Sequence, residues 1–348
     1  MAELPYTHPI IPLDSIVLIT GANGLIASWA AEKLLKYGYR VRGTVRSVSR
    51  CSWMEPFFAN RYGPGRFELI EVSDFSAPGA WDSAVKGVAG VAVVAAQVDF
   101  DLVDIDAAVN VELSSVTGLL KAAKDESSVK SIVFTSSAWA AWTPDPSKKV
   151  TLHEWSYNAE AVRVARSGAS REEKGISGFM AFRSLLEQRI WDWIRTEKPS
   201  YTFNTILPDT VFGTTLSPKN QGIQSTCGMV SWVRDGVNLN VIASLRAQRF
   251  VDTEDLGLLY VSALTTPGVD GERLFAFGNK YNFAKVAQIL QKLEPKKKIP
   301  AVEDDGWDQT DVPDKRAESL VSALNGRGWA KLEDSIRDCL SSIQQLDH

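Results

Sequence analysis

Apolar residues recur along the first two thirds of the chain in short continuous runs that alternate with segments of helical periodicity. The runs predict β-strands at residues 16–19, 41–46, 67–72, 90–96 and 131–134. Apolar side chains at helical spacing predict helices at residues 28–35, 107–123 and 178–195. Alternation of this kind is typical of α/β proteins whose parallel sheet has helices on both faces. We therefore expect a doubly wound parallel sheet.

After Gly213 the alternation loosens and polar residues become frequent. Residues 250–256 and a helix through Leu264 are expected to return the chain to the main domain. Amphipathic helices are predicted at residues 285–293 and 317–324. This pattern predicts a main domain over residues 1–213 and a smaller C-terminal lobe, mainly over residues 214–348, that binds substrate.

A glycine-containing turn follows the first predicted strand and precedes the first predicted helix. It reads Gly21-Ala22-Asn23-Gly24-Leu25-Ile26-Ala27. A dinucleotide pyrophosphate lies against backbone N–H groups at a helix N-terminus, where the helix dipole favours negative charge. A side chain at Gly21 or Gly24 would block that approach. We expect a Rossmann-type nucleotide site here, with contacts from Gly21, Asn23, Gly24, Leu25 and Ile26; an ordinary tight turn is the alternative.

The end of the second predicted strand indicates which nucleotide binds. Sites that prefer NAD place an acidic residue there for the ribose 2′-hydroxyl. This chain has Arg46 and, shortly after, Arg50. Guanidinium groups suit a 2′-phosphate, so the expected cofactor is NADP(H). Two solvated surface arginines are the alternative.

Composition narrows the class further. The 348 residues are 45% hydrophobic and 23% charged, with a net charge of -4. This balance gives no support for binding to nucleic acid or anionic membranes. No apolar stretch reaches the roughly 20 residues that span a bilayer, and the N-terminus lacks the plan of a secretory signal. Three scattered cysteines suggest neither a metal site nor disulfides, so we expect a cytoplasmic monomer or homodimer.

Polar or small residues at the carboxyl ends of later strands are further candidates for the site. Asp74 follows the third strand, where it can bind an adenine amino group or cap the next turn. Ala95, Ala96 and Gln97 end the fourth strand and are expected to face the cofactor. Pro208 and Asp209 follow the apolar Ile206 and Leu207 in the same way.

The motifs Thr20-Gly21-Ala22-Asn23-Gly24, Val41-Arg42-Gly43-Thr44-Val45-Arg46, Phe134-Thr135-Ser136-Ser137 and Leu207-Pro208-Asp209 resemble the extended short-chain dehydrogenases/reductases. Within them the chain is most similar to the dihydroflavonol-reductase-like branch, which includes fungal and yeast aldehyde and ketone reductases. The resemblance runs from about residue 15 to about residue 278. It implies an NADP(H)-dependent oxidoreductase in which Ser137 hydrogen-bonds the substrate carbonyl; a serine that only caps the strand end is the alternative.

The chain departs from that family at its catalytic motif. The family carries a tyrosine and, four residues later, a lysine on the long helix that follows. Phe179 and Arg183 stand at those positions. Phenylalanine has no O–H to donate, whereas arginine can still hydrogen-bond ribose hydroxyls. The resemblance therefore implies a nucleotide site without the usual proton donor.

Three residues are candidates for a substitute acid. His153 and Tyr157 lie in the segment that leads to this helix, and both residue types donate protons. Asp209 can remain protonated if nicotinamide and substrate exclude water from it. The structural alternatives are a surface histidine, a packed tyrosine and a loop-capping aspartate.

The chain holds eleven tryptophans, and aromatic residues are frequent near the predicted site. We expect this group to hold a bulky, apolar small-molecule substrate or to fill the core: Trp139, Trp142, Trp155, Phe179, Phe182 and Phe212. Three functions fit the sequence. They are reduction of a carbonyl or imine with a displaced acid, a redox-neutral cyclase or isomerase of secondary metabolism, and a nucleotide-sensing regulator without catalysis.

Overall fold

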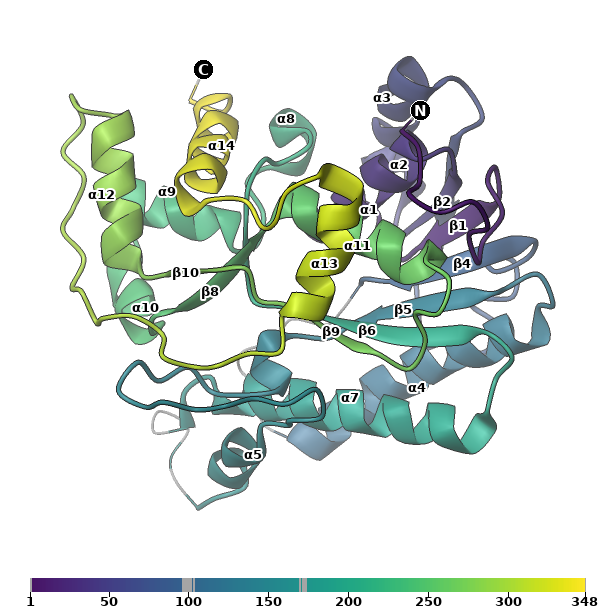
Figure 1. Cartoon of the computed structure of the whole chain (residues 1–348), viewed down its shortest axis with the longest axis horizontal. Helices are drawn as coiled ribbons and strands as arrows, with labels where there is room; N and C mark the ends of the chain where they lie inside the picture. Colours follow the sequence, from purple (N-terminus) through teal and green to yellow (C-terminus); the bar gives the residue numbers. More distant parts are fainter. Residues whose placement is uncertain (1, 96–101, 103, 169, 171–173, 348) are drawn as a thin grey trace.

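The computed structural model describes residues 2–95, 102, 104–168, 170 and 174–347. Its larger part is built on a seven-stranded sheet with the order β3-β2-β1-β4-β5-β6-β9 (Figure 1). The strands are β1 (Ile16–Ile19), β2 (Arg40–Val45), β3 (Phe67–Glu71), β4 (Val88–Val93), β5 (Ser131–Thr135), β6 (Thr202–Pro208) and β9 (Arg273–Ala276). Every pairing within this sheet is parallel. The predicted doubly wound Rossmann-type fold is confirmed.

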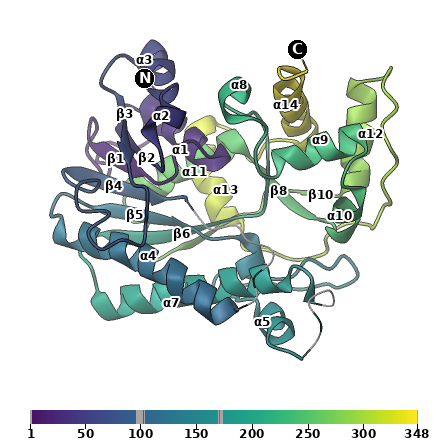
Figure 2. The same ribbon diagram turned by 180° about the vertical axis from the view of Figure 1, so that it is seen from behind.

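Helices cover both faces of this sheet (Figures 1 and 2). Helices α4 (Ile105–Asp125) and α7 (Ser177–Glu197) lie on one face, and α1 (Leu25–Lys36), α11 (Thr253–Thr265) and α13 (Lys315–Asn325) lie on the other. The central strands β4 and β5 are buried at every position, which explains their continuous apolar sequence. The two largest hydrophobic clusters among the described residues lie on opposite faces, and the one that includes α1 and α11 continues into the smaller part.

Strand order reverses between β1 and β4, because β2 pairs on one side of β1 and β4 on the other. In sheets of this kind the space outside the carboxyl ends of the strands at the reversal is where ligands bind. The turn after β1, Val94 and Ala95 after β4, and the segment after β5 all face this space. The fold therefore places the glycine turn and Ser137 at one edge of the sheet.

The smaller part contains a three-stranded sheet of β7 (Thr210–Phe212), β8 (Gln248–Asp252) and β10 (Asn279–Tyr281), with β8 in the centre. Helices α9 (Cys227–Asp235), α10 (Leu239–Ser244), α12 (Phe283–Leu293) and α14 (Leu332–Gln344) surround it (Figure 1). The remaining helices are α2 (Val48–Cys51), α3 (Met54–Tyr62), α5 (Ala159–Ala165), α8 (Pro218–Gln221) and the 3-10 turn η1 (Ala138–Ala140). None of the helices in the described ranges has the length and apolarity to cross a bilayer.

Strand β9 pairs at the edge of the larger sheet, and helix α13 packs against one of its faces. The C-terminal half therefore contributes more to the larger part than the predicted residues 250–265 alone. Helix α14, which the apolar pattern did not predict, docks against α9 in the smaller part. There the Sγ atoms of Cys227 and Cys339 lie 3.4 Å apart, and both cysteines are buried. Two of the cysteines that are far apart in sequence are therefore neighbours in the fold.

Candidate active site

The turn between β1 and α1 keeps the N-terminus of the helix bare. Gly21 has φ +67°, a left-handed conformation that favours glycine, and a Cβ there would lie 3.0 Å from the Cβ of Ala95. Gly24 is the N-cap of α1 and offers no side chain to occupy the helix end. The first N–H groups of α1 therefore remain available for an anion.

A single large cavity of about 1440 Å³ opens from this turn. It extends along the carboxyl ends of the strands to the smaller part of the molecule, and exceeds the roughly 300–1,000 Å³ typical of a drug-sized ligand. That volume leaves room for more than one drug-sized ligand. The cavity brings together most of the residues selected from the sequence: Gly21, Asn23, Gly24, Leu25, Ile26, Arg46, Arg50, Ala95, Ser137, Phe179, Arg183, Pro208 and Asp209.

One end of the cavity is positively charged. Arg46 follows β2 and Arg50 lies in α2, and both are exposed at the rim. Neither forms an ion pair with a side chain in the described ranges. The side-chain oxygen of Asn23 accepts a hydrogen bond from the Trp53 indole at 3.2 Å, which fixes the turn beside them. The two guanidinium groups are thus free to bind a phosphate.

Ser137 lies at the other end, directly after β5. Its hydroxyl oxygen accepts a hydrogen bond from the backbone N–H of Trp139 at 3.2 Å and so caps η1. The hydroxyl hydrogen remains free to be donated into the cavity. Ser137 therefore combines the capping role with an accessible donor.

Phe179 and Arg183 lie one helical turn apart on α7, and both line the cavity. The ring of Phe179 packs edge-on against Trp139, with 6.2 Å between the ring centroids. The guanidinium of Arg183 is buried; its Nη2 donates to the Thr135 carbonyl at 2.6 Å, while Nη1 has no hydrogen-bond partner among the described residues. Burial lowers the pKa of Arg183, and Glu112 opposes this shift. A buried N–H donor that lacks a partner at the cavity wall can donate a hydrogen bond to a hydroxyl group of a bound ligand.

Asp209 is buried at the end of β6. Its Oδ1 accepts a hydrogen bond from the Thr210 N–H at 2.8 Å, and its Oδ2 accepts one from the Arg249 N–H at 3.0 Å. Burial raises the pKa of Asp209 to about 7, although both hydrogen bonds oppose the shift. This carboxyl group therefore carries a proton in an appreciable fraction of molecules at neutral pH.

The other proton-donor candidates lie elsewhere. His153 is exposed, and the ring of Tyr157 lies beneath the Arg273 guanidinium at 4.2 Å; neither is among the described residues that line the cavity. Asp74 is exposed, and its Oδ1 accepts hydrogen bonds from Ser76, so it takes the turn-capping role. Ala96 and Gln97 lie outside the described residues.

The predicted aromatic group is divided. Trp139 and Phe179 line the cavity, whereas Trp142, Phe182 and Phe212 are buried in the core. Trp155 is 50% exposed and packs edge-on against Trp191. The core-filling alternative therefore holds for half of the group, because burial against neighbouring helices and strands competes with the cavity for aromatic side chains.

Several residues at the cavity wall were not found from the sequence. Thr226 and Met229, from the start of α9, close the cavity from the smaller part. Glu112 comes from α4, on the same helical face as the buried Val109 and Val116. A carboxylate on an otherwise apolar helical stripe is a signal that could have selected Glu112.

A buried ion pair holds α7 in place behind these residues. Glu187 and Arg273 are both fully buried, and the Glu187 oxygens accept from Arg273 Nε and Nη2 at 2.8 and 2.9 Å. Glu187 also accepts hydrogen bonds from the hydroxyls of Ser136 and Thr205. This network joins α7 to the residue after β5, to the middle of β6 and to the start of β9, so it fixes the wall that carries Phe179.

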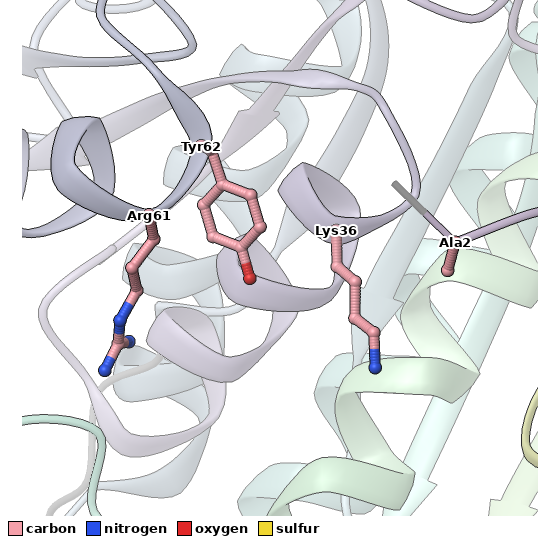
Figure 3. Close-up of a pocket in the computed structure, with 4 residues that line it drawn as sticks. All are labelled: Ala2, Lys36, Arg61 and Tyr62. Atoms are coloured by element: carbon pink, nitrogen blue, oxygen red, sulfur yellow. The ribbon is translucent and has the colours of Figure 1, made fainter.

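A second, smaller hollow lies near the N-terminus, beside α1 and α3. It is lined by Ala2, Lys36, Arg61 and Tyr62 (Figure 3). The guanidinium of Arg61 lies over the ring of Phe57, and the Tyr62 hydroxyl donates to Glu32 at 2.6 Å. Two of its polar groups are thus already engaged, so the large cavity is the candidate site. The reversed strand order, the glycine turn and this cavity together define a dinucleotide-binding α/β protein.

Comparison with known proteins agrees with that class. A model of the NAD dependent epimerase/dehydratase family matches residues 17–162. Aldehyde reductase 2 of Sporidiobolus salmonicolor is 33% identical over 338 residues, covering 96% of this chain and 98% of the relative. A ketoreductase of Penicillium rubens is 37% identical over 334 residues, covering 94% and 96%. The chain belongs to the NAD dependent epimerase/dehydratase family of extended short-chain dehydrogenases/reductases, as its motifs predicted.

Solved structures show the same fold. The yeast methylglyoxal/isovaleraldehyde reductase, determined in complex with NADPH, has a TM-score of 0.77 at 21% identity, over 95% of this chain and 99% of that one. Alfalfa vestitone reductase has a TM-score of 0.71 at 18% identity, over 96% and 99%. The architecture is therefore shared over essentially the whole chain.

Proposed function

We propose that this protein catalyses NADP(H)-dependent reduction of a carbonyl or imine carbon in a bulky, apolar small molecule, with a proton donor other than tyrosine. The observation that carries the proposal is one cavity that joins a bare helix N-terminus and two free arginines to Ser137 and Arg183. Membership of the family, with relatives named as aldehyde reductase and ketoreductase, supports this reaction class.

In this proposal the chain binds the nucleotide through groups of three kinds. The N–H groups at the start of α1, with Asn23, Leu25 and Ile26 beside them, hold the pyrophosphate. Arg46 and Arg50 bind the 2′-phosphate. The free Nη1 of Arg183 donates to a ribose hydroxyl, in the position where the family carries lysine. Ala95 and Pro208 flank the nicotinamide ring, and the cofactor supplies the hydride when it is bound.

The substrate end of the cavity is apolar. Trp139, Phe179 and Met229 line it, and side chains of this kind bind flat hydrophobic molecules by contact and exclusion of water. Ser137 donates a hydrogen bond that orients the acceptor atom. Phe179 occupies the position of the family's tyrosine without its hydroxyl, so a ketone needs a proton from elsewhere, whereas an iminium ion needs none.

The proposal is tested by calorimetric titration with NADPH and NADH, followed by NADPH oxidation assays with aldehydes, ketones and cyclic imines. We expect tighter binding of NADPH than of NADH, and oxidation of NADPH by at least one bulky aromatic acceptor. Absence of binding would overturn the nucleotide site. Tight binding without oxidation by any acceptor would overturn the reductase.

A redox-neutral cyclase or isomerase is the second candidate, and the absence of a hydroxyl on Phe179 favours it. An apolar cavity can hold a reactive substrate in a productive shape without acid–base groups. This function predicts that NADPH binds but is not consumed when a substrate is converted. Product analysis by mass spectrometry distinguishes the two, because reduction adds two hydrogens and isomerisation adds none.

A further inference from the structure

We infer that Asp209 is the general acid of this site, donating to the substrate oxygen the proton that Phe179 cannot supply. The inference rests on the proposed reductase function and assigns one step of it to a named residue. Three features of the structure carry it: the place of Asp209 in the sheet, the way its carboxyl group is held, and its separation from any cationic partner.

Asp209 is placed beside the substrate-orienting serine by the sheet itself. Strands β5 and β6 are parallel neighbours, with Thr135 opposite Ile206. Continuing that register by two residues sets Ser137 beside Pro208, and Asp209 is the next residue. Adjacent strands are about 4.8 Å apart. Ser137 and Asp209 thus stand at the same edge of the sheet, and both line the cavity.

In the described part of the chain, the donors to this carboxyl group are backbone N–H groups. Each oxygen accepts one N–H, from Thr210 and from Arg249, and each retains a second lone-pair position. A protonated carboxyl group keeps both of these bonds and still has an O–H to donate. The side chain is therefore fixed in position while its proton remains available.

Among the residues that the structure describes, no cationic side chain forms an ion pair with Asp209. The Arg249 guanidinium is directed to Asp308 at 3.1 Å and to the carbonyls of Gly278 and Thr310. Asp308 raises the pKa of Asp209 and Arg249 lowers it. Tyr281 of β10 lies close by with its pKa raised, chiefly by burial, and so remains neutral. Across the cavity stand Arg183 and Glu112. Burial is the dominant influence, and it favours the neutral acid.

The carbonyl carbon receives a hydride from NADPH, and the C=O π pair moves onto the substrate oxygen. That oxygen, hydrogen-bonded by Ser137, takes the proton from the Asp209 carboxyl group. The products are an alcohol, NADP⁺ and a carboxylate, and the carboxylate regains its proton from water. An N-alkylated iminium ion, by contrast, becomes a neutral amine on hydride transfer and needs no acid.

Asp252 provides a matched control. It is also buried, and burial raises its pKa to about 7. Its oxygens, however, accept from the Ser335 hydroxyl and the Glu254 N–H, and it is not among the described residues that line the cavity. Asp209 and Asp252 thus share burial and differ in access to the cavity.

The experiment compares Asp209→Asn, Asp252→Asn and the unaltered protein on a bulky aryl ketone and on an N-methyl cyclic iminium salt. General acids contribute on the order of 10² to 10⁴ in rate. We expect Asp209→Asn to lower kcat for the ketone by about 10²-fold or more while iminium reduction and NADPH binding by calorimetry stay near the unaltered values. Asp252→Asn should change kcat for the ketone and for the iminium ion to the same extent. An equal fall on both substrates, or no fall on either, overturns the inference.

Two further measurements do not depend on how well Asp209→Asn folds. In the unaltered protein, ketone turnover should fall as the pH rises above about 7, while iminium turnover stays level. Adding Phe179→Tyr to Asp209→Asn should restore ketone reduction, because a tyrosine hydroxyl replaces the acid. Level ketone turnover across this pH range, or no rescue in a folded double variant, overturns the role of Asp209. If the unaltered protein oxidises NADPH with neither substrate, the proposed function itself fails.

Discussion

The two ends of the large cavity recognise a ligand by different means. At the end formed by β1 and β2, backbone N–H groups and exposed arginines face the cavity. The atoms around Gly21 and Gly24 leave little room for other side chains at these positions. At the end formed by β5, β6 and α7, side chains form the wall: the half-buried Ser137 and the buried Phe179, Arg183 and Asp209. Backbone recognition depends on the fold, whereas side-chain chemistry changes with single substitutions. The fold alone therefore determines the first end, whereas single substitutions can alter the chemistry of the second.

The largest expected effect lies behind the second end, at the buried Glu187–Arg273 pair. Arg273→Met leaves the Glu187 carboxylate buried without a countercharge, so the free energy of unfolding should fall by about 3–5 kcal/mol. Urea denaturation measures this. Arg316→Met, which breaks the more exposed pair with Glu272, is the control and should cost about 1 kcal/mol or less. Equal effects would show that the wall does not depend on the buried pair.

The next prediction tests whether the side chains at positions 179 and 183 limit ketone reduction at the second end. In the Asp209→Asn background, which lacks the proposed acid, Phe179→Tyr combined with Arg183→Lys introduces a tyrosine hydroxyl and a lysine, and ketone reduction should rise on the order of 10²-fold. The control is Phe179→Leu with Arg183→Lys, which lacks the hydroxyl and should give no rise. A rise in both would indicate that the lysine, and not the proton donor, limits the rate.

A smaller effect is expected at the first end. Arg46→Ala removes one charge-assisted hydrogen bond, worth about 1.5–3 kcal/mol, so NADPH affinity should fall at least about tenfold while NADH affinity is unchanged. Arg61→Ala, which removes the same charge beside the second hollow, should alter neither affinity. Calorimetry measures both. A parallel loss of NADPH and NADH affinity would place Arg46 away from the 2′-phosphate.

The smallest expected effect is on the pH dependence of the free energy of unfolding, at a residue outside both ends of the cavity. Burial raises the pKa of Asp252 to about 7 in the folded protein, so the neutral form stabilises the fold at low pH. This contribution is lost as the pH rises from the unfolded value near 4 through about 7. Asp252→Asn should make the free energy of unfolding less dependent on pH between 5 and 7, as measured by urea titration at each pH. An unchanged slope would contradict the shift.

The first end was largely predictable from the sequence because it is local. Gly21, Gly24 and Arg46 lie on one strand–turn–helix–strand unit, and the spacing of that unit fixes where they meet. The observed boundaries differ slightly from the predicted ones. Helix α1 begins at Leu25, three residues earlier than expected, and β4 covers Val88–Val93 rather than residues 90–96. Hydrogen bonding to neighbouring strands sets these limits, and the apolar pattern does not contain that information.

The second end was only partly predictable because distant segments form it. Ser137 and Asp209 follow apolar strands and were selected for that reason, and the cavity includes both. Tyr157 was selected from its sequence position near α7, but its ring stacks on Arg273, a residue more than a hundred positions away. Met229 comes from the smaller part, and the sequence periodicity there does not indicate which side chains point toward the cavity. Tertiary contacts decide such cases.

Helix α11 has a consequence for how the protein is made. Gly257 packs so closely on α1 that a Cβ there would lie 2.8 Å from the Trp29 carbonyl oxygen. The ribosome releases α1 long before it synthesises α11, so the face of α1 that packs against α11 stays exposed during that time. Translation must pass residue 265 before that face is sealed. Fragments ending near residue 213 are therefore expected to need chaperones or to aggregate, and a recombinant nucleotide-binding half requires α11 supplied in trans.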